Sequence, residues 1–351
     1  MNRRRRLLGL LPAALCPLLS SCNLPETPKE VVVYTALDEE FSRPIFAKFT
    51  RDTGIAVKAS YDTEATKTVG LAAKLLAERE RPRADLFWNN ELLHTLRLKR
   101  AGLLKAQPLS ADSDFDPEHR SPDGDWRGFA ARARVIIVNT DLLKEPRWPD
   151  SIEDFTDPQW YDKAGVAKPL FGTTATHAAC LRAAWGEERF RKYFLGVKRN
   201  CRIVASNKRV AKEVAAGNLL FGLTDTDDAI IEKEAGAPVE IIYPDQPVTD
   251  ADGALGTLFI PNTVAMIEGS PNPRAGEALA EFLLTSVVEC RLVIGPSAQI
   301  PLNNNSKSDN ACRCRVKTPE EVRAMDVDWE AAADAWDSAS KWLAEELTAG
   351  L

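Results

Sequence analysis

Short apolar runs alternate with segments of helical apolar period along almost the whole chain, which is typical of α/β architecture. In the first unit the apolar run 31–34 predicts a strand, and Phe41, Ile45, Phe46 and Phe49 then share one helical stripe. Similar runs predict further strands at 55–59, 84–88, 134–138, 166–168, 219–223, 239–243, 258–260 and 264–267. Helical periods predict helices at 69–76, 91–99, 178–185, 187–194 and 209–216, one after Pro273 and one at the C-terminus.

Two polar segments interrupt this alternation. Residues 111–125 are rich in Asp, Ser, Pro and Gly, so we expect a surface loop there. Residues 303–310 are polar and low in complexity, which predicts a loop or a mobile insertion. No repeat of fixed period is visible.

The N-terminus has the form of a bacterial export signal. Four arginines precede the apolar run 7–19, which is too short to span a bilayer, where about 20 residues are needed. Small residues then precede Cys22 and resemble a lipobox, in which the cysteine is acylated. We therefore expect a lipoprotein signal peptide at 1–21 and a tether at 22–30. The four arginines leave Sec and twin-arginine export both open.

Composition and charge exclude several classes of protein. The 351 residues carry 45 basic and 51 acidic side chains, a formal charge of −6 that becomes −10 once the signal is removed. Such a surface does not attract phosphate backbones, so nucleic acid is a poor partner. The 44% hydrophobic and 27% charged content is ordinary for a globular protein of about two domains. Disorder, a collagen-like fold and a polytopic membrane protein are excluded.

Five cysteines lie beyond Cys22, at positions 180, 201, 290, 312 and 314. An exported protein can form disulfides, but an odd number leaves at least one thiol unpaired. One residue separates Cys312 from Cys314, a spacing that suits neither a redox pair nor the usual zinc site. We interpret one of these two as a partner for Cys290 and leave the pairing open.

Several motifs in order give the chain a family resemblance. They are the strand 33–36, the strand 84–88, the segments 222–229 and 256–262, and the tetrapeptide 299–302. Together with the lipobox, they make the chain similar to the family 1 extracellular solute-binding proteins, and in particular to their ferric-iron-binding branch. The resemblance covers roughly residues 31–348.

That resemblance implies a type II periplasmic-binding fold, in which two α/β lobes are joined by two crossing strands and hold a ligand in the cleft between them. The crossings are expected near 132–138 and 257–266. We expect lobe 1 at 31–131 plus 260–305, lobe 2 at 132–259, and a loop and C-terminal helix at 306–351 packed on lobe 2. Closure of the lobes about this hinge would trap the ligand.

The resemblance also implies partners and a location. We expect the substrate-binding component of an ABC importer, working with a permease and its ATPase, as a monomer with no catalytic cofactor. It would lie in the periplasm or on the outer face of the cytoplasmic membrane, anchored by lipid at Cys22; the inner or the outer membrane could hold the anchor.

The chain departs from the iron-binding members of this family at the ligand positions. Those members use a first-loop histidine, a carboxylate and two adjacent tyrosines, whereas this chain has Asp38 on that loop and no adjacent tyrosines among its five. Thr224, Asp225 and Asp227 stand where the tyrosine pair would be, directly after the apolar run 219–223. Carboxylates at a strand end can bind a hard metal such as Fe(III), with Asp225 and Asp227 as its ligands, or an ammonium group. The alternative is that Asp227 or Asp228 only caps the next helix.

Two predicted helix starts could bind an anion, whereas the carboxylates described above could bind a cation. Thr173, Thr174 and Thr176 begin one apolar helix, and Ser206 and Asn207 precede another. Free backbone N–H groups and hydroxyls at a helix N-terminus bind anions, although the same residue types are ordinary helix caps. Glu64 and Asn90 are weaker ligand candidates because each only follows a strand of the first lobe.

These features predict a cleft that binds both signs of charge. Our first hypothesis is Fe(III) with a synergistic anion such as carbonate or phosphate. The alternative in the same fold is a phosphonate, an organophosphate or another small zwitterion, its acid on the helix starts and its amine on Asp225. A secreted metal-dependent hydrolase lacks any nucleophile elbow or dense ligand motif. A sensory protein that signals to a membrane receptor also stays open.

Overall fold

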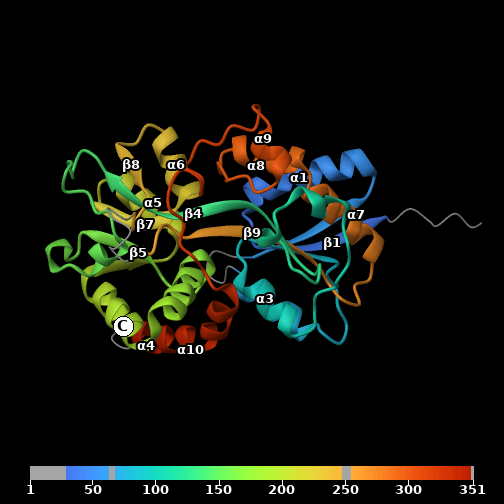
Figure 1. The fold of residues 1–351 in the computed structure, drawn as a ribbon, viewed down its shortest axis with the longest axis horizontal. Helices are drawn as coiled ribbons and strands as arrows, with labels where there is room; N and C mark the ends of the chain where they lie inside the picture. The colour runs from blue at the N-terminus through green and yellow to red at the C-terminus, as the bar shows by residue number, and fades with distance from the viewer. Residues whose placement is uncertain (1–28, 63–67, 247–253, 349–351) are drawn as a thin grey trace, which may run out of the picture.

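The computed structural model describes residues 29–62, 68–246 and 254–348. Two α/β lobes lie side by side, and the long strands β4 (Arg127–Asn139) and β9 (Phe259–Met266) run between them (Figure 1). The expected two-lobed architecture with two crossing strands is therefore confirmed. Among the described residues, no helix combines the length and the apolar character that a bilayer crossing needs.

The first lobe is built on parallel strands that follow the predicted apolar runs. Its strands are β1 (Glu30–Thr35), β2 (Ala56–Tyr61) and β3 (Leu86–Asn89). Its helices are α1 (Glu39–Thr53), α2 (Val69–Ala77), α3 (Leu93–Arg100), α7 (Pro273–Leu283), α8 (Ser286–Ile294) and α9 (Asn304–Ser308). Strand β1 pairs in parallel with β2 and β3, and β9 is antiparallel to β3.

The second lobe is a smaller sheet attached to the far half of β4. Its strands are β5 (Ala164–Ala167), β6 (Cys201–Val204), β7 (Phe221–Asp225) and β8 (Val239–Ile242). Its helices are α4 (Gly172–Asn200), α5 (Asn207–Ala215) and α6 (Thr226–Glu234). The strand order through both lobes is β2-β1-β3-β9-β4-β7-β5-β6, with β8 also paired to β4. Short 3₁₀ helices occur at Ser110–Asp114, Pro117–His119, Ile152–Thr156 and Pro158–Trp160.

Strand β4 joins the two lobes. All thirteen of its residues are buried. Its first half pairs with β9, and its second half pairs with β7 and β8. The apolar period predicts only the part 134–138, because Arg127 and Arg132 interrupt the apolar pattern before it. The whole strand nevertheless forms, so charged side chains are buried on it.

A bulge on β4 marks the crossing. The register of β4 on β9 shifts between Phe129 and Arg132, and Ala130 has a φ of 47°. A non-glycine residue seldom adopts this left-handed conformation, so it must be held by its surroundings. The buried Glu289 accepts the backbone N–H of Ala130 at 2.8 Å, and Asn262 donates its side-chain amide to the Ala130 carbonyl. These two side chains hold the bulge.

Glu289 also fixes the chain that returns past the crossing. Its carboxylate accepts the backbone N–H groups of Leu302 and Asn303, each at 2.9 Å. Burial raises the pKa of Glu289, and these N–H donors act in the opposite direction. One buried carboxyl thus ties α8, β4 and the segment before α9 together.

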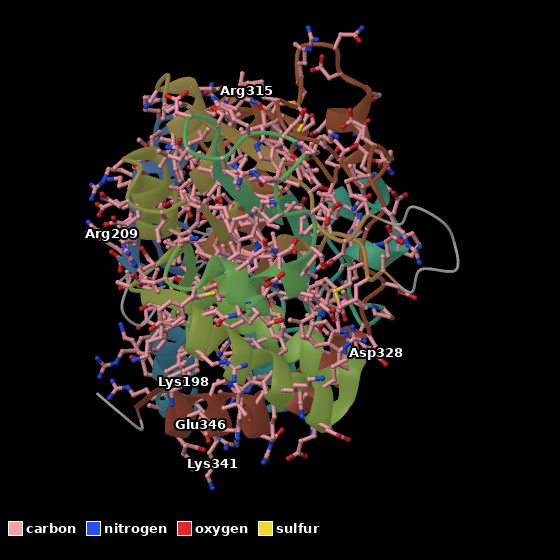
Figure 2. All side chains as sticks on the ribbon, turned by 90° about the vertical axis from the view of Figure 1, so that its left-hand side faces the viewer. Lys198, Arg209, Arg315, Asp328, Lys341 and Glu346 are labelled. Atoms are coloured by element: carbon pink, nitrogen blue, oxygen red, sulfur yellow. A yellow bond between two sulfur atoms is a disulfide. The ribbon has the colours of Figure 1, made fainter. Side chains whose placement is uncertain are left out.

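Helix α10 (Trp329–Thr348) lies along one side of the molecule, against α4 and α3 (Figure 1). The predicted stripe is on its inner face, where Ala332, Trp336 and Leu343 are buried. Lys198 of α4 lies 3.8 Å from Glu346 of α10, and both are visible at the C-terminal end of the helix (Figure 2). Charged pairs also link α10 to Arg97 and Arg100 of α3. The lobe boundaries expected from the sequence stay a prediction.

Several predicted elements differ from the structure. The prediction of a loop or a mobile insertion at 303–310 is wrong, because the segment contains the helix α9. The Asn303 side chain accepts the N–H groups of Asn305 and Ser306 and so caps this helix. The two helices expected at 178–185 and 187–194 are confirmed as two segments within α4, because Gly186, with a φ of 74° and a ψ of 178°, is non-helical and separates them. The two runs 258–260 and 264–267 form one strand, β9. Strand β6 and helix α8 were not predicted.

The predicted disulfide is confirmed. Cys290 bonds to Cys312, whereas Cys314, Cys180 and Cys201 are free thiols. The bond ties α8 to the chain that follows α9. Cys22, with its signal peptide and most of the tether, lies outside the described residues.

Asp245, which follows β8, is a partly buried acid that fixes the start of a 3₁₀ helix. Its Oδ1 accepts the Ser151 hydroxyl at 2.6 Å and the Ile152 N–H at 3.3 Å. Burial raises the pKa of Asp245 to about 6. Its φ of 59° is one that asparagine also tolerates.

This raised pKa predicts a pH-dependent stability difference between the wild type and the variant Asp245→Asn. The unfolded carboxyl ionises near pH 4, so its stabilising contribution is full below that pH and is lost as the pH rises through about 6. The asparagine keeps both hydrogen bonds but cannot ionise. As the pH rises from 4 to 7, the free energy of unfolding of the wild type should fall by about 2 kcal/mol relative to that of the variant, measured by urea denaturation.

The exposed Asp141 provides the matched control, because its carboxylate is largely in water. Asp141→Asn should give no such pH trend. A constant difference between wild type and Asp245→Asn across this range would contradict the assignment.

Candidate functional site

A cavity lies between the lobes, at the ends of β5 and β7 and beside the crossing strand β4. Strand carboxyl ends of an α/β sheet are the usual ligand position. The described residues that line it are Leu37, Asp38, Phe41, Arg132, Ala167, Lys168, Phe171, Gly172, Thr173, Thr174, Ala205, Ser206, Asn207, Lys208, Asp225, Asp227 and Asp228. Most of the predicted ligand residues therefore meet at one cavity.

Asp225 is the last residue of β7 and lies opposite Arg134 in the β4–β7 register. Side chains of directly opposed residues lie on the same face of a sheet and contact each other. The Arg134 Nη1 donates to Asp225 Oδ1 at 2.6 Å. Arg134 is fully buried and Asp225 is 5% exposed. The carboxylate predicted to face a ligand therefore has a buried guanidinium as its partner.

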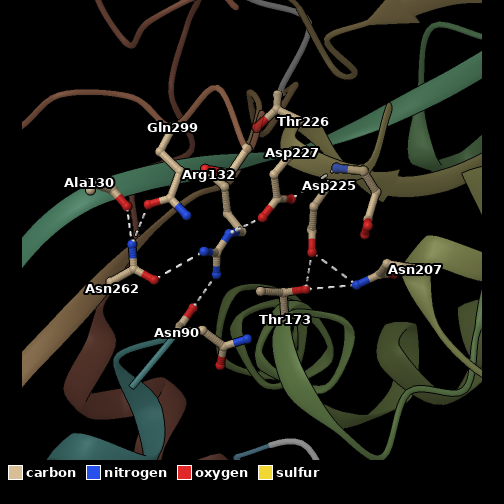
Figure 3. Close-up of polar contacts among 12 residues, drawn as sticks. Asn90, Ala130, Arg132, Thr173, Asn207, Asp225, Thr226, Asp227, Asn262 and Gln299 are labelled. Atoms are coloured by element: carbon tan, nitrogen blue, oxygen red, sulfur yellow. Dashed lines mark hydrogen bonds and ion pairs between the residues drawn. The ribbon is translucent and has the colours of Figure 1, made fainter. Parts of the chain in front are cut away.

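The second oxygen of Asp225 is also engaged. Its Oδ2 accepts the Thr173 hydroxyl at 2.5 Å and the Asn207 side-chain amide at 3.0 Å (Figure 3). Asn207 also donates to the Thr173 hydroxyl at 2.8 Å, and it accepts the Thr174 hydroxyl at 2.8 Å. The polar side chains at the starts of α4 and α5 thus converge on one carboxylate.

Arg132, two residues before Arg134, connects both lobes to the crossing strands. Its Nη1 donates to the Asn90 carbonyl at 2.7 Å, and its Nη2 donates to Asn262 Oδ1 at 3.0 Å. Its Nε lies 3.0 Å from Asp227 Oδ2 (Figure 3). The first partner follows β3 in the first lobe, the second is on β9, and the third is on α6 in the second lobe. Arg132 is adjacent to the β4 bulge, so the cavity and the crossing share a residue.

Asp227 and Asp228 lie in the first turn of α6. The alternative prediction that one of them caps this helix is wrong, because Asp225 occupies the N-cap position and makes no side-chain capping bond. Carboxylates in a first turn are favoured by the helix dipole. One oxygen from each of Asp225, Asp227 and Asp228 lies within 4.8 Å of the others, close enough to share a cation. The three aspartates thus form a real cluster, one member of which is paired with Arg134.

Some of the other predicted ligand residues line the cavity, and the rest contact residues of the site without lining it. Ser206 lines the cavity and caps α5 by accepting the Arg209 N–H at 3.2 Å, and Asp38 lines it from the loop after β1. Thr176 lies behind it and donates to Glu91 at 3.2 Å, and Thr224 donates to the Asn207 carbonyl at 3.0 Å. Asn90 supports Arg132 and does not line the cavity. Glu64 lies outside the described residues.

The positively charged residues of the site were not predicted from the sequence. Arg132, Lys168 and Lys208 line the cavity, and Arg134 lies behind Asp225. Arginines at alternate positions of an otherwise apolar strand were the available signal, because such residues are buried only when paired. His177 of α4 adds no positive charge to the site. Burial, together with the charge of Arg134, lowers the pKa of His177 to about 3, so its imidazole is neutral at pH 7.

Lys208 also links the lobes at the edge of the cavity. Its Nζ lies 2.7 Å from Glu40 of α1, although Lys208 itself lies in the first turn of α5 in the second lobe. Its hydrogen bond to Glu40 raises the pKa of Lys208 against the opposing effect of partial burial. Lys208 therefore stays charged at neutral pH, and its contact with Glu40 is one of those that hold α1 against α5.

Comparisons with known proteins agree with this geometry. Residues 84–255 match the model of a family described as bacterial extracellular solute-binding protein. Iron uptake protein A1 of Synechocystis sp. is 26% identical over 319 residues, which cover 83% of this chain and 85% of that protein. A putative 2-aminoethylphosphonate-binding periplasmic protein of Salmonella typhimurium is 23% identical over 333 residues, 91% of this chain and 93% of its own length.

A solved structure shares the fold. Iron-bound HitA from Pseudomonas aeruginosa superposes with a TM-score of 0.79 at 23% identity, covering 90% of this chain and 99% of the other. At this identity the likeness shows the architecture, which is the type II periplasmic-binding fold expected from the sequence.

The buried pair predicts a large effect of Asp225→Asn on stability. The asparagine keeps the shape of the side chain but leaves the Arg134 charge buried without a counter-charge. Breaking such a pair typically costs about 3–5 kcal/mol. We expect a loss of that size in the free energy of unfolding, measured by urea denaturation without phosphate or sulfate.

The surface pair of Asp162 with Arg202, at 2.7 Å and 2.9 Å, is the matched control. Water already solvates both partners, so Asp162→Asn should leave stability nearly unchanged. An equally small loss in Asp225→Asn would show that Arg134 does not depend on Asp225.

Proposed function

We propose that this chain, which belongs to the bacterial extracellular solute-binding proteins, is the ligand-capturing component of an ABC importer, with ferric iron as its cargo. The observation that carries the proposal is the aspartate cluster in a cleft between two lobes. A permease and its ATPase would receive the loaded protein. The iron uptake protein of Synechocystis sp. supports this choice of cargo.

The donors in the cleft suit a hard cation. Fe(III) favours anionic oxygen ligands, and the described lining residues supply these through Asp38, Asp225, Asp227 and Asp228. Asp227 and Asp228 are the central donors in this proposal: both oxygens of Asp225 already accept hydrogen bonds, whereas Asp227 has one oxygen against Arg132. No tyrosine, histidine or cysteine is among the lining residues that the structure describes. A carboxylate set would then replace the phenolates of the iron-binding members.

Capture rather than catalysis is supported by the same lining. Ser206 is the serine of the cavity, and its hydroxyl caps α5 without a histidine beside it among the described lining residues. Nucleophilic catalysis needs a base within hydrogen-bond reach of the nucleophile. A serine nucleophile is therefore not supported among these lining residues. A metal-dependent hydrolase would use the aspartate cluster instead, and the relatives named above, an iron uptake protein and a phosphonate-binding protein, favour binding over catalysis.

A small zwitterion is the second candidate. Arg132, Lys168 and Lys208 line the same cavity as the aspartates, so a ligand with an acid at one end and an amine at the other would find both charges. The phosphonate-binding relative supports this alternative.

The location follows from the N-terminal sequence. We propose that the mature protein begins at Cys22, carries acyl chains there, and lies in the periplasm or on the outer face of the cytoplasmic membrane as a monomer. The intact mass of the protein from membranes would reveal the acyl groups, and a chain that keeps residues 1–21 would contradict this.

The cargo is tested by the melting temperature in the presence of ferric nitrilotriacetate, compared with 2-aminoethylphosphonate. A ligand that binds the folded state alone at one hundred times its Kd adds about 2.7 kcal/mol of stability. We expect the ferric complex to raise the melting temperature of the wild type, and the double variant Asp227→Asn/Asp228→Asn to abolish that rise.

The control removes two carboxylates from the other end of the same helix, in Glu232→Gln/Glu234→Gln, and should keep the response. Stabilisation by the phosphonate but not by ferric iron would overturn the metal in favour of the zwitterion. No response to either would contradict both cargo assignments.

A further inference from the structure

The donors that the sequence assigns to a bound anion are already occupied. Thr173 begins α4 and Asn207 begins α5, and both donate to Oδ2 of Asp225, at 2.5 Å and 3.0 Å. Arg134 donates to the other oxygen at 2.6 Å. Figure 3 shows the Thr173 hydroxyl and the Asn207 amide on this carboxylate. Together with the Arg134 guanidinium, they are the contacts that a small oxyanion would receive.

The charge at this position also requires an anion. Arg134 is fully buried, and its Nε and Nη2 have no hydrogen-bond partner among the described residues. A buried cation without a counter-charge is strongly unfavourable. His177 is neutral and does not change this balance. The counter-charge of Arg134 in the structure is the Asp225 carboxylate.

We propose that Asp225 is a built-in anion: its carboxylate occupies the position formed by Thr173, Asn207 and Arg134 and excludes external oxyanions from it. The cargo of the proposed function, on which this inference rests, then binds without an anion on the starts of α4 and α5. An incoming phosphate or phosphonate would meet a carboxylate there, and like charges repel.

Asp225 is therefore a specificity-determining residue. It turns the position between Thr173 of α4 and Asn207 of α5 from one that binds anions into one that is internally bonded. Asp227 and Asp228 remain beside it for a cation, and an acidic group of a ligand is left with Arg132, Lys168 or Lys208 on other sides of the cavity.

Chemical rescue tests this directly. Asp225→Ala removes the carboxylate, and formate has the size of the missing group, whereas formamide has a similar shape without the charge. The melting temperature of Asp225→Ala should rise saturably with sodium formate, with sodium chloride balancing the ionic strength. Formamide should not raise it. Neither the wild type nor the surface variant Asp162→Ala should respond to formate. Equal responses to formate and formamide, or none in Asp225→Ala, would overturn the proposal.

A second measurement decides the question even when Asp225→Ala does not fold. Calorimetric titration of the wild type and of Asn207→Ala with inorganic phosphate, without iron, should show no binding that depends on Asn207. Phosphate binding to the wild type that weakens tenfold or more in Asn207→Ala would place an external anion on these donors and overturn the proposal. No iron enters either test, so its outcome is separate from that of the cargo.

Discussion

The buried ion pair of Arg134 with Asp225 is the interaction on which the rest of the site depends. A guanidinium inside a sheet must meet a negative charge, and the antiparallel register of β4 on β7 places Asp225 directly opposite. Thr173 and Asn207 then bond to the same carboxylate, so the starts of α4 and α5 are fixed relative to β7. The pair therefore sets the shape and the charge of the second lobe's wall of the cleft.

The same strand couples this wall to the crossing between the lobes. Arg132, on the same face of β4, contacts Asn90 of the first lobe, Asn262 of β9 and Asp227 of the second lobe. The bulge at Ala130 lies just before it and is held by the buried Glu289. A ligand that draws Asp227 toward itself would change a contact of Arg132, and this gives the cavity a physical link to the strands about which the lobes move.

The sequence predicts the larger part of this arrangement and misses its electrostatics. Apolar periods locate most strands and helices, and the polar residues after strand 219–223 do meet the starts of α4 and α5. The pairing of Arg134 with Asp225 was beyond reach, because it depends on the register between two strands 90 residues apart. Two short elements were also not predicted. Helix α9 depends on the Asn303 cap and shows no apolar period, and strand β6 is only four residues long, which is too short to show a pattern. Cys22 and Glu64 fall outside the described residues, so these two predictions are unchanged.

The central claim is that a cation binds on Asp227 and Asp228 while Asp225 stays bonded to Arg134. Anomalous diffraction at the iron absorption edge tests it most directly, on crystals grown with ferric nitrilotriacetate and without phosphate or carbonate. The account predicts a peak beside Asp227 and Asp228, with the Asp225 carboxylate still on Arg134, Thr173 and Asn207. A cleft that holds an oxyanion on those three residues, with Asp225 turned away, would contradict it.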